Sequence, residues 1–159
     1  MSLQGPHPEY GDLIEFFRPV YTHWGVYVGN GYVVHLSDLD GLSSLYSAFG
    51  CVIVKKEPLW LVANGDIYRV NNKDGKNRKP YPPKIIVKRA LEEVGELKEY
   101  SLTSYNCEHF ATKLRYGTGF SDQVRDAAIC TAGATAALVL AGVVAGAIYC
   151  IEKDKRQRE

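Results

Sequence analysis

The residues best suited to covalent chemistry in this chain are Cys107 and the histidines at positions 23, 35 and 109. Cys107 follows Asn106, a favourable helix N-cap, so we expect the cysteine to be the first residue of a helix. The positive end of the helix dipole favours the thiolate, which is the nucleophilic form of cysteine. Free amides at the helix start could also hold a developing oxyanion. The alternative interpretation is that Cys107 is a small buried hydrophobic residue.

His23 and His35 flank a glycine-rich turn, Gly29-Asn30-Gly31, within alternating apolar sequence. This pattern predicts a β-hairpin. A two-residue loop would pair His35 with Val26 and place the two histidines on opposite faces of the sheet. A three-residue loop pairs His35 with Gly25 and places both histidines on one face. The two histidines can therefore act in one site only if the loop has three residues or a strand carries a bulge.

A cysteine at a helix start, packed against a sheet that carries a histidine and a second polar group, is the papain-like arrangement. Here His23 would draw the thiol proton and later return it to a leaving group, and His35 would orient the ring of His23. The chain order is base, orienting residue and then nucleophile, the reverse of papain, so the fold would be a permuted version. His109 has no chemical role in this arrangement and is expected to pack around the site.

The elements that position these residues are predicted as strands first and helices later. The predicted strands are residues 12–17, 23–28, 32–36, 51–54, 59–62 and 67–70. Pro82-Pro83 precedes a helical apolar period and predicts a helix through Val94, and a second helix would begin at Cys107. We therefore expect an α+β fold with an antiparallel sheet packed on helices.

Residues 127–151, AAICTAGATAALVLAGVVAGAIYCI, contain no charged side chain. As a helix they would span roughly 37 Å, enough to cross a hydrocarbon core of about 30 Å with some tilt. Buried core helices rarely run so long without a polar face, so we expect a transmembrane anchor. Gly142 and Gly146 form a small-residue motif through which the anchor could associate with another helix.

The chain is therefore predicted to divide into a catalytic domain (residues 1–126), the anchor (127–151) and a short basic tail (152–159). The positive-inside rule alone would keep the basic tail in the cytosol. Nothing upstream of the anchor would carry a folded domain across a membrane. We therefore expect a cytosolic catalytic domain anchored to the endoplasmic reticulum, the peroxisome or another intracellular membrane.

Composition argues against other classes of function. The 159 residues carry 19 Lys and Arg against 18 Asp and Glu, without a basic stripe that would indicate a nucleic acid partner. The N-terminus lacks an apolar signal segment, so the four cysteines do not favour disulfides, and Cys51 is expected to be a packed strand residue. The loop at residues 71–80 carries four basic residues, which are either solvated or in contact with anionic lipid.

At these residues the sequence resembles the lecithin:retinol acyltransferase superfamily, and more closely its HRAS-like suppressor group of phospholipase A/acyltransferases. The similar segments are His23-Trp-Gly-Val-Tyr-Val-Gly29, Gly31-Tyr-Val-Val-His35 and Asn106-Cys-Glu-His-Phe110. The similarity runs from about Gly11 through the anchor. The resemblance implies a permuted NlpC/P60 fold in which Cys107 is the nucleophile, His23 the base and His35 the third member.

The resemblance also implies a reaction. Members of this group form an acyl-cysteine thioester from a glycerophospholipid without calcium. They pass the acyl group to water, as phospholipases A1 and A2, to the amine of phosphatidylethanolamine, or to a lysophospholipid. We therefore expect phosphatidylcholine and phosphatidylethanolamine as substrates, a membrane as partner, and no cofactor or metal. An anchored domain would meet such substrates at high effective concentration.

Three alternatives are open. Cys107, His109, His23 and His35 could form a zinc site, although Cys107 and His109 are two residues apart at a helix start and would point in different directions. A thiol amidase or peptidase could use the same three catalytic residues, but a lipid anchor argues against it. A non-catalytic membrane adaptor would keep every cellular effect after Cys107→Ser.

Overall fold

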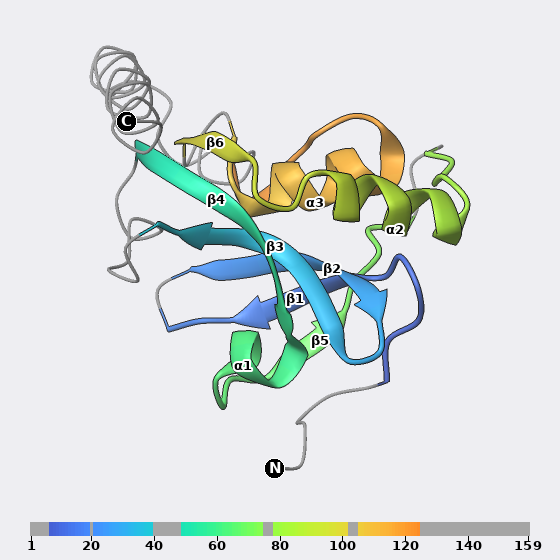
Figure 1. Cartoon of the computed structure of the whole chain (residues 1–159), viewed down its shortest axis with the longest axis horizontal. Helices are drawn as coiled ribbons and strands as arrows, with labels where there is room; N and C mark the ends of the chain where they lie inside the picture. Colours follow the sequence, from blue (N-terminus) through green and yellow to red (C-terminus); the bar gives the residue numbers. More distant parts are fainter. Residues whose placement is uncertain (1–6, 20, 40–48, 75–77, 102–104, 125–159) are drawn as a thin grey trace.

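The computed structural model describes residues 7–19, 21–39, 49–74, 78–101 and 105–124. In chain order its elements are β1 (Leu13–Phe17), β2 (Thr22–Gly29), β3 (Tyr32–Asp38), β4 (Phe49–Pro58), α1 (Leu59–Ala63), β5 (Tyr68–Val70), α2 (Pro83–Glu92), β6 (Leu97–Ser101) and α3 (Cys107–Tyr116). The strands form one antiparallel sheet in the order β5-β1-β2-β3-β4-β6. Helices α2 and α3 cover one face of the sheet and α1 lies on the other (Figure 1). The predicted α+β class with an antiparallel sheet is confirmed.

The β2–β3 hairpin decides which face of the sheet the two histidines occupy. A two-residue loop closes the hairpin, and the register shifts by one residue between Tyr27 and Gly29. This bulge pairs His35 with Gly25, so that His35 and His23 become diagonal neighbours on one face. We predicted that His23 and His35 can share a face only if the loop has three residues or a strand carries a bulge. The structure has the bulge.

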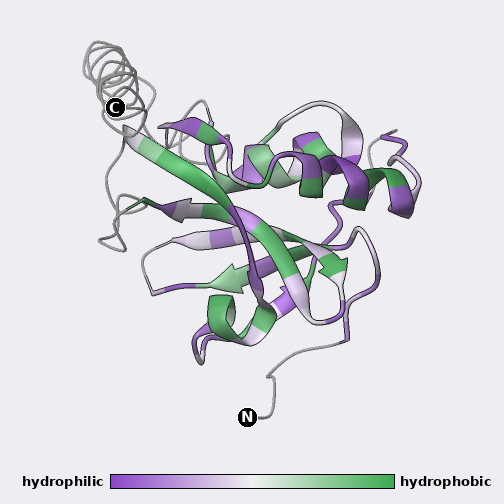
Figure 2. Cartoon of the chain, viewed as in Figure 1, coloured by the Kyte–Doolittle hydropathy of each residue, from purple (hydrophilic) through white to green (hydrophobic). Residues whose placement is uncertain are grey.

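Two apolar clusters form on opposite faces of the sheet. The larger one, under α2 and α3, includes Trp24, Val34, Ile86 and Phe110, and the smaller one, under α1, includes Ile14, Phe16, Leu59 and Val62. Because side chains alternate along a strand, His23 and His35 point to the α1 face, opposite their neighbours Trp24 and Val34. In Figure 2 the helices α2 and α3 alternate between purple and green along their length, as expected for helices with one buried face, whereas α1 is mostly green.

Two elements differ from the sequence prediction. Residues 59–62 were expected to be a strand and instead form α1. Pro58 ends β4 immediately before this run, Asn64 closes the helix in a left-handed conformation (φ 48°), and a short apolar run does not distinguish strand from helix. β6 was not predicted, because its sequence LKEYS has little apolar alternation; its pairing with β4 stabilises it.

No helix within the described ranges is long and apolar enough to cross a membrane. The predicted anchor at residues 127–151, its paired glycines Gly142 and Gly146, and the tail at 152–159 lie outside the described residues. The anchor and the domain boundaries therefore stay predictions.

Candidate active site

Helix α3 begins at Cys107, as predicted, because Asn106 caps it. Asn106 is extended (φ −109°, ψ −176°), and its side-chain oxygen accepts hydrogen bonds from the amides of Glu108 and His109, both at 3.0 Å. His109 Nδ1 in turn accepts from the amide of Asn106 at 3.2 Å, which completes a capping box with histidine in the third helical position. His109 therefore holds the start of the helix that carries Cys107.

The amides at this helix start are less free than the sequence suggested. Those of Glu108 and His109 donate to Asn106. Of the first three helical amides, this leaves that of Cys107 as the candidate donor to an oxyanion.

The thiol of Cys107 is buried against the backbone of β2. Its Sγ donates to the carbonyl oxygen of Thr22 at 3.6 Å. Burial raises the pKa of the thiol to about 12, although hydrogen bonds from the amides of Trp24, Glu108 and Cys107 itself favour the thiolate. We expected the helix start to favour the thiolate; the amides do act in that direction, but desolvation outweighs them. Cys107 is therefore a neutral thiol at neutral pH and needs a base to remove its proton.

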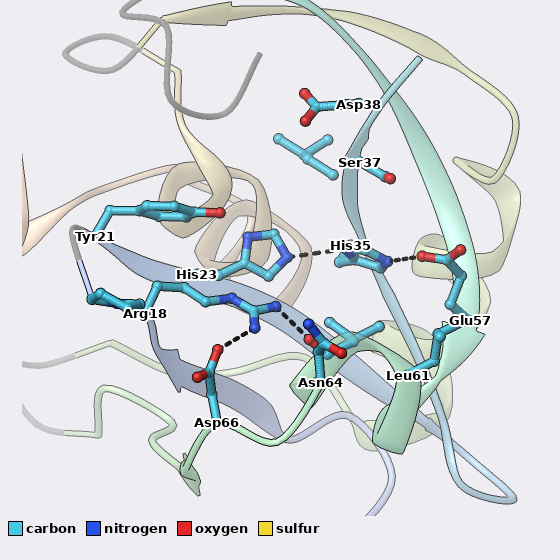
Figure 3. Close-up of a pocket in the computed structure, with 13 residues that line it drawn as sticks. Arg18, Tyr21, His23, His35, Ser37, Asp38, Glu57, Leu61, Asn64 and Asp66 are labelled. Carbon is cyan, nitrogen blue, oxygen red and sulfur yellow. Dashed lines mark hydrogen bonds and ion pairs between the residues drawn. The ribbon is translucent and has the colours of Figure 1, made fainter. Parts of the chain in front are cut away.

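His23, His35 and Glu57 form a hydrogen-bonded chain on the α1 face of the sheet (Figure 3). His23 Nε2 lies 3.0 Å from His35 Nδ1, and His35 Nε2 lies 2.7 Å from Glu57 Oε2. An ionised carboxylate can only accept, so Nε2 of His35 carries a proton, and Nδ1 of a neutral His35 then accepts from His23 Nε2–H. The bare lone pair of His23 is consequently on Nδ1, a buried atom without a hydrogen-bond partner among the described residues.

The charge states of this chain suit proton transfer. Burial lowers the pKa of His23 well below 6.5, and electrostatic interactions with His35 and Arg18 lower it further, so His23 is neutral at pH 7. The hydrogen bond from His35 lowers the pKa of Glu57 below its usual value of 4.5, which keeps the carboxylate ionised. His23 is thus an unprotonated acceptor with its lone pair oriented by two further residues.

Both histidines line a pocket of about 620 Å³, a size typical of small-molecule sites. Arg18 lines the same pocket, forms an ion pair with Asp66 and donates to the carbonyl oxygens of Val62 and Ala63, which ties the end of β1 to α1. Cys107 is not among the described residues that line this pocket. Its thiol instead touches the carbonyl of Thr22, the residue preceding His23 on β2. The structure therefore joins the two histidines directly and places the cysteine against the strand that carries the first of them.

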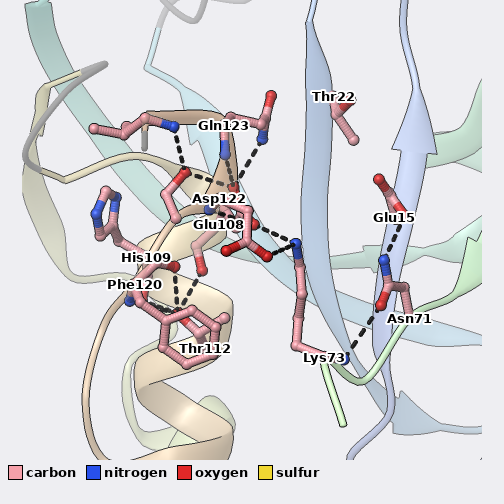
Figure 4. A network of polar contacts seen from close by, with 12 residues as sticks. Glu15, Thr22, Asn71, Lys73, Glu108, His109, Thr112, Phe120, Asp122 and Gln123 are labelled. Carbon is pink, nitrogen blue, oxygen red and sulfur yellow. Dashed lines mark hydrogen bonds and ion pairs between the residues drawn. The ribbon is translucent and has the colours of Figure 1, made fainter. Parts of the chain in front are cut away.

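A polar network that the sequence gave no signal for surrounds the residue after Cys107 (Figure 4). Glu108 is fully buried, with Lys73 Nζ 2.6 Å from its Oε1, and Ser121 and Gln123 donate to its other oxygen. Burial raises the pKa of Glu108, but these three partners together lower it below its usual value. We expected Lys73 to be solvated or in contact with lipid; it is instead a largely buried counterion of Glu108, a partner that lies far away in the sequence. The network fixes the start of α3 against two other segments.

The zinc alternative finds no support in the described part of the chain, where no cluster of three or more His, Cys, Asp or Glu side chains is placed to hold a metal. His109 is committed to the helix cap, while His23 and His35 bond to each other. Cys51 is buried in β4 at 2% exposed, as expected for a packed strand residue. Cys107 is the free cysteine among the residues described.

The fold and the site define an α+β domain with a free, buried cysteine at a helix start and a hydrogen-bonded histidine pair on an antiparallel sheet. The profile of the lecithin retinol acyltransferase family matches residues 6–120. The chain is 49% identical to human phospholipase A and acyltransferase 2 over 99% of this chain and 100% of that protein. It is 47% identical to human phospholipase A and acyltransferase 3, over 97% of each chain, and 41% identical to human phospholipase A and acyltransferase 4, over 98% of each. The chain therefore belongs to the lecithin retinol acyltransferase family, and the resemblance seen in its motifs is confirmed.

Proposed function

We propose that this protein is a calcium-independent phospholipase A and acyltransferase in which Cys107 is the nucleophile, His23 the general base and His35 the residue that orients it. The names of its relatives supply the class of substrate. The observation that carries the residue roles is the Glu57–His35–His23 chain, which leaves a bare, buried lone pair on His23 Nδ1. Glu57 enters the proposal as a positioning residue that acts through His35.

In the first half-reaction, Sγ of Cys107 leaves the carbonyl of Thr22 to come within reach of His23 Nδ1. It then gives its proton to that nitrogen as it attacks an ester carbonyl carbon of a glycerophospholipid. Because the resting thiol is neutral, proton transfer and attack belong to one step. The amide of Cys107 can donate to the oxyanion. The ester C–O bond then breaks, the proton on His23 passes to the departing alkoxide, and an acyl-cysteine thioester and a lysophospholipid remain.

In the second half-reaction an acceptor attacks the thioester carbonyl and gives its proton to His23, which returns it to the sulfur. Water as acceptor yields a fatty acid and completes phospholipase A1 or A2 hydrolysis. The amine of phosphatidylethanolamine yields an N-acyl product, and a lysophospholipid hydroxyl yields a new diacyl lipid. We propose phosphatidylcholine and phosphatidylethanolamine as substrates. Phosphatidylethanolamine can also serve as an acceptor, because a thioester can pass its acyl group to a nitrogen as well as to an oxygen nucleophile.

The proposal extends to the rest of the chain. Residues 1–126 form the catalytic domain, with a permuted NlpC/P60 topology, and residues 127–151 anchor it in an intracellular membrane with the domain in the cytosol. The uncharged stretch at 127–151 supports the anchor. Association between anchors through Gly142 and Gly146 would follow from their small-residue spacing.

The test uses the purified chain and phosphatidylcholine with a different acyl chain at each position, in the presence of a calcium chelator. We expect fatty acid and lysophospholipid from the unsubstituted chain, and loss of turnover in Cys107→Ser and His23→Ala. His7→Ala, which changes an exposed histidine outside the site, is the matched control and keeps its turnover. Undiminished turnover in Cys107→Ser would contradict the proposal.

A further inference from the structure

Helix α1 is apolar on every side. Its sequence is Leu-Trp-Leu-Val-Ala, and Leu59, Val62 and Ala63 are buried. The two remaining side chains are largely exposed, Trp60 at 55% and Leu61 at 46%. A surface helix ordinarily carries polar residues on its outer face. The outer face of α1 is therefore an apolar surface that the packing of the helix itself does not use.

This surface is continuous with the candidate active site. Leu61 lines the same pocket as His23 and His35 (Figure 3). Ile67, at 60% exposed, follows Asp66, another lining residue. Trp60, Leu61 and Ile67, which we call the α1 rim, are thus exposed apolar residues that either line the pocket or directly adjoin a residue that lines it.

The two parts of the α1 rim are fixed relative to each other. Arg18 donates to the carbonyl oxygens of Val62 and Ala63 and also pairs with Asp66. This one guanidinium therefore joins the end of α1 to the segment that leads into Ile67. The rim is held as one surface and does not depend on two independent loops.

We propose that the α1 rim docks on the surface of a phospholipid bilayer, with Trp60 and Leu61 among the acyl chains nearest the headgroups. The inference rests on the proposed function for the identity of the substrate. An ester that moves from a bilayer to His23 must draw its acyl chain with it, and an apolar rim keeps that chain out of water on the way. Tryptophan is the side chain best suited to the boundary between headgroups and acyl chains.

The pocket lining carries Arg18 and three carboxylates, Asp38, Glu57 and Asp66, and a further cationic side chain lies near it. Lys55 lies two residues before Glu57 on β4, on the same face of the sheet, and its positive charge contributes to lowering the pKa of Glu57. An ammonium group beside the pocket can contact lipid phosphate. The anchor proposed at residues 127–151 would tether the domain, whereas the α1 rim would turn the pocket toward the membrane.

The two tryptophans provide a direct test, because Trp24 is 1% exposed and Trp60 is 55% exposed. The full chain is reconstituted in phosphatidylcholine vesicles, with and without bromine on the acyl chains. We expect the brominated acyl chains to quench the emission of Trp60. We also expect iodide dissolved in the water to quench this emission less than it does in the absence of vesicles. Trp60→Phe should abolish both effects and Trp24→Phe should retain them. Emission that stays open to iodide and insensitive to brominated lipid would overturn the proposal.

A second measurement compares turnover on vesicles with turnover on a short-chain phospholipid dissolved in water. Trp60→Ser should lower the ratio of vesicle to dissolved-substrate turnover by about tenfold, since it removes the largest apolar group of the rim. Ile85→Ser, at a 42% exposed position on α2, is the matched control and should leave the ratio unchanged. An unchanged ratio in Trp60→Ser would contradict docking through α1. If the unsubstituted chain turned over neither lipid, the proposed function would fail, while the fluorescence would still decide whether the rim docks.

Discussion

Glu57→Gln removes the charge that fixes the proton of His35 while leaving the size of the side chain almost unchanged. In the native chain the carboxylate accepts from His35 Nε2–H at 2.7 Å, which sets the tautomers of both histidines. A glutamine can rotate and donate its amide to the same nitrogen. His35 Nδ1 would then carry the proton and donate to His23 Nε2, and the remaining proton of His23 would move to Nδ1. A proton on that atom blocks the proposed base.

The size of the effect follows from the hydrogen bond that is weakened. A hydrogen bond to a charged group contributes about 1.5–3 kcal/mol and one between neutral groups about 0.5–1.5 kcal/mol. The midpoints of these two ranges differ by about 1.2 kcal/mol, which corresponds to roughly an eightfold fall in kcat/KM. Loss of the base itself in His23→Ala should cost more, about 10²–10⁴-fold.

The assay is kcat/KM on a dissolved short-chain phospholipid as a function of pH. Removing a negative charge disfavours protonation of the histidine pair, so the acid limb of the profile should also move to lower pH. A purely structural defect would lower the profile without moving this limb. Glu92→Gln changes an exposed carboxylate on α2 and serves as the matched control. If kcat/KM of Glu57→Gln stayed within about twofold of the unsubstituted chain with the limb unmoved, the assigned tautomers would be wrong.

Four further results are expected. Alkylation of Cys107 by iodoacetamide in the lipid-free chain should keep accelerating as the pH rises above 9, because burial raises the pKa of the thiol to about 12; a plateau near pH 7 would show a thiolate already present. Lys73→Met should lower the free energy of unfolding by about 3–5 kcal/mol in urea titrations, because it strips the buried carboxylate of Glu108 of its counterion, and adding Glu108→Gln should recover part of the loss. The pKa of His23 is depressed in the folded state, so below pH 6.5 the unfolded chain binds more protons than the folded chain. The free energy of unfolding should therefore fall as the pH drops through 6.5, and His23→Gln should flatten this dependence when unfolding is measured across pH. A chain truncated after Asp126 should keep turnover on dissolved lipid and lose it on vesicles, and loss of both would make residues 127–151 part of the folded site.

Local signals in the sequence were sufficient for the elements that carry the candidate site. An asparagine before the cysteine predicted the start of α3, and the glycine-rich turn predicted the β2–β3 hairpin. The face shared by His23 and His35 could only be stated as a condition, because a one-residue bulge is set by packing across the sheet and leaves no clear local pattern.

Features that depend on distant partners could not be predicted. Glu57 is 22 residues from His35 in the sequence and reaches it only because β3 and β4 pair. The ion pair between Lys73 and Glu108 likewise exists only in the folded chain. The protonation of Cys107 was misjudged for the same reason, because the helix dipole can be inferred from sequence whereas the burial of the thiol cannot.

The central claim is that an acyl group passes through a covalent bond to Cys107, and intact-protein mass spectrometry tests it most directly. The full chain is mixed with phosphatidylcholine carrying two acyl chains of different mass and quenched in acid over a series of times. We predict a species heavier by one acyl group, located on Cys107 by peptide mapping and absent from Cys107→Ser and His23→Ala. Release of fatty acid without any acylated chain at the earliest times, or an acyl adduct that persists in Cys107→Ser, would contradict it.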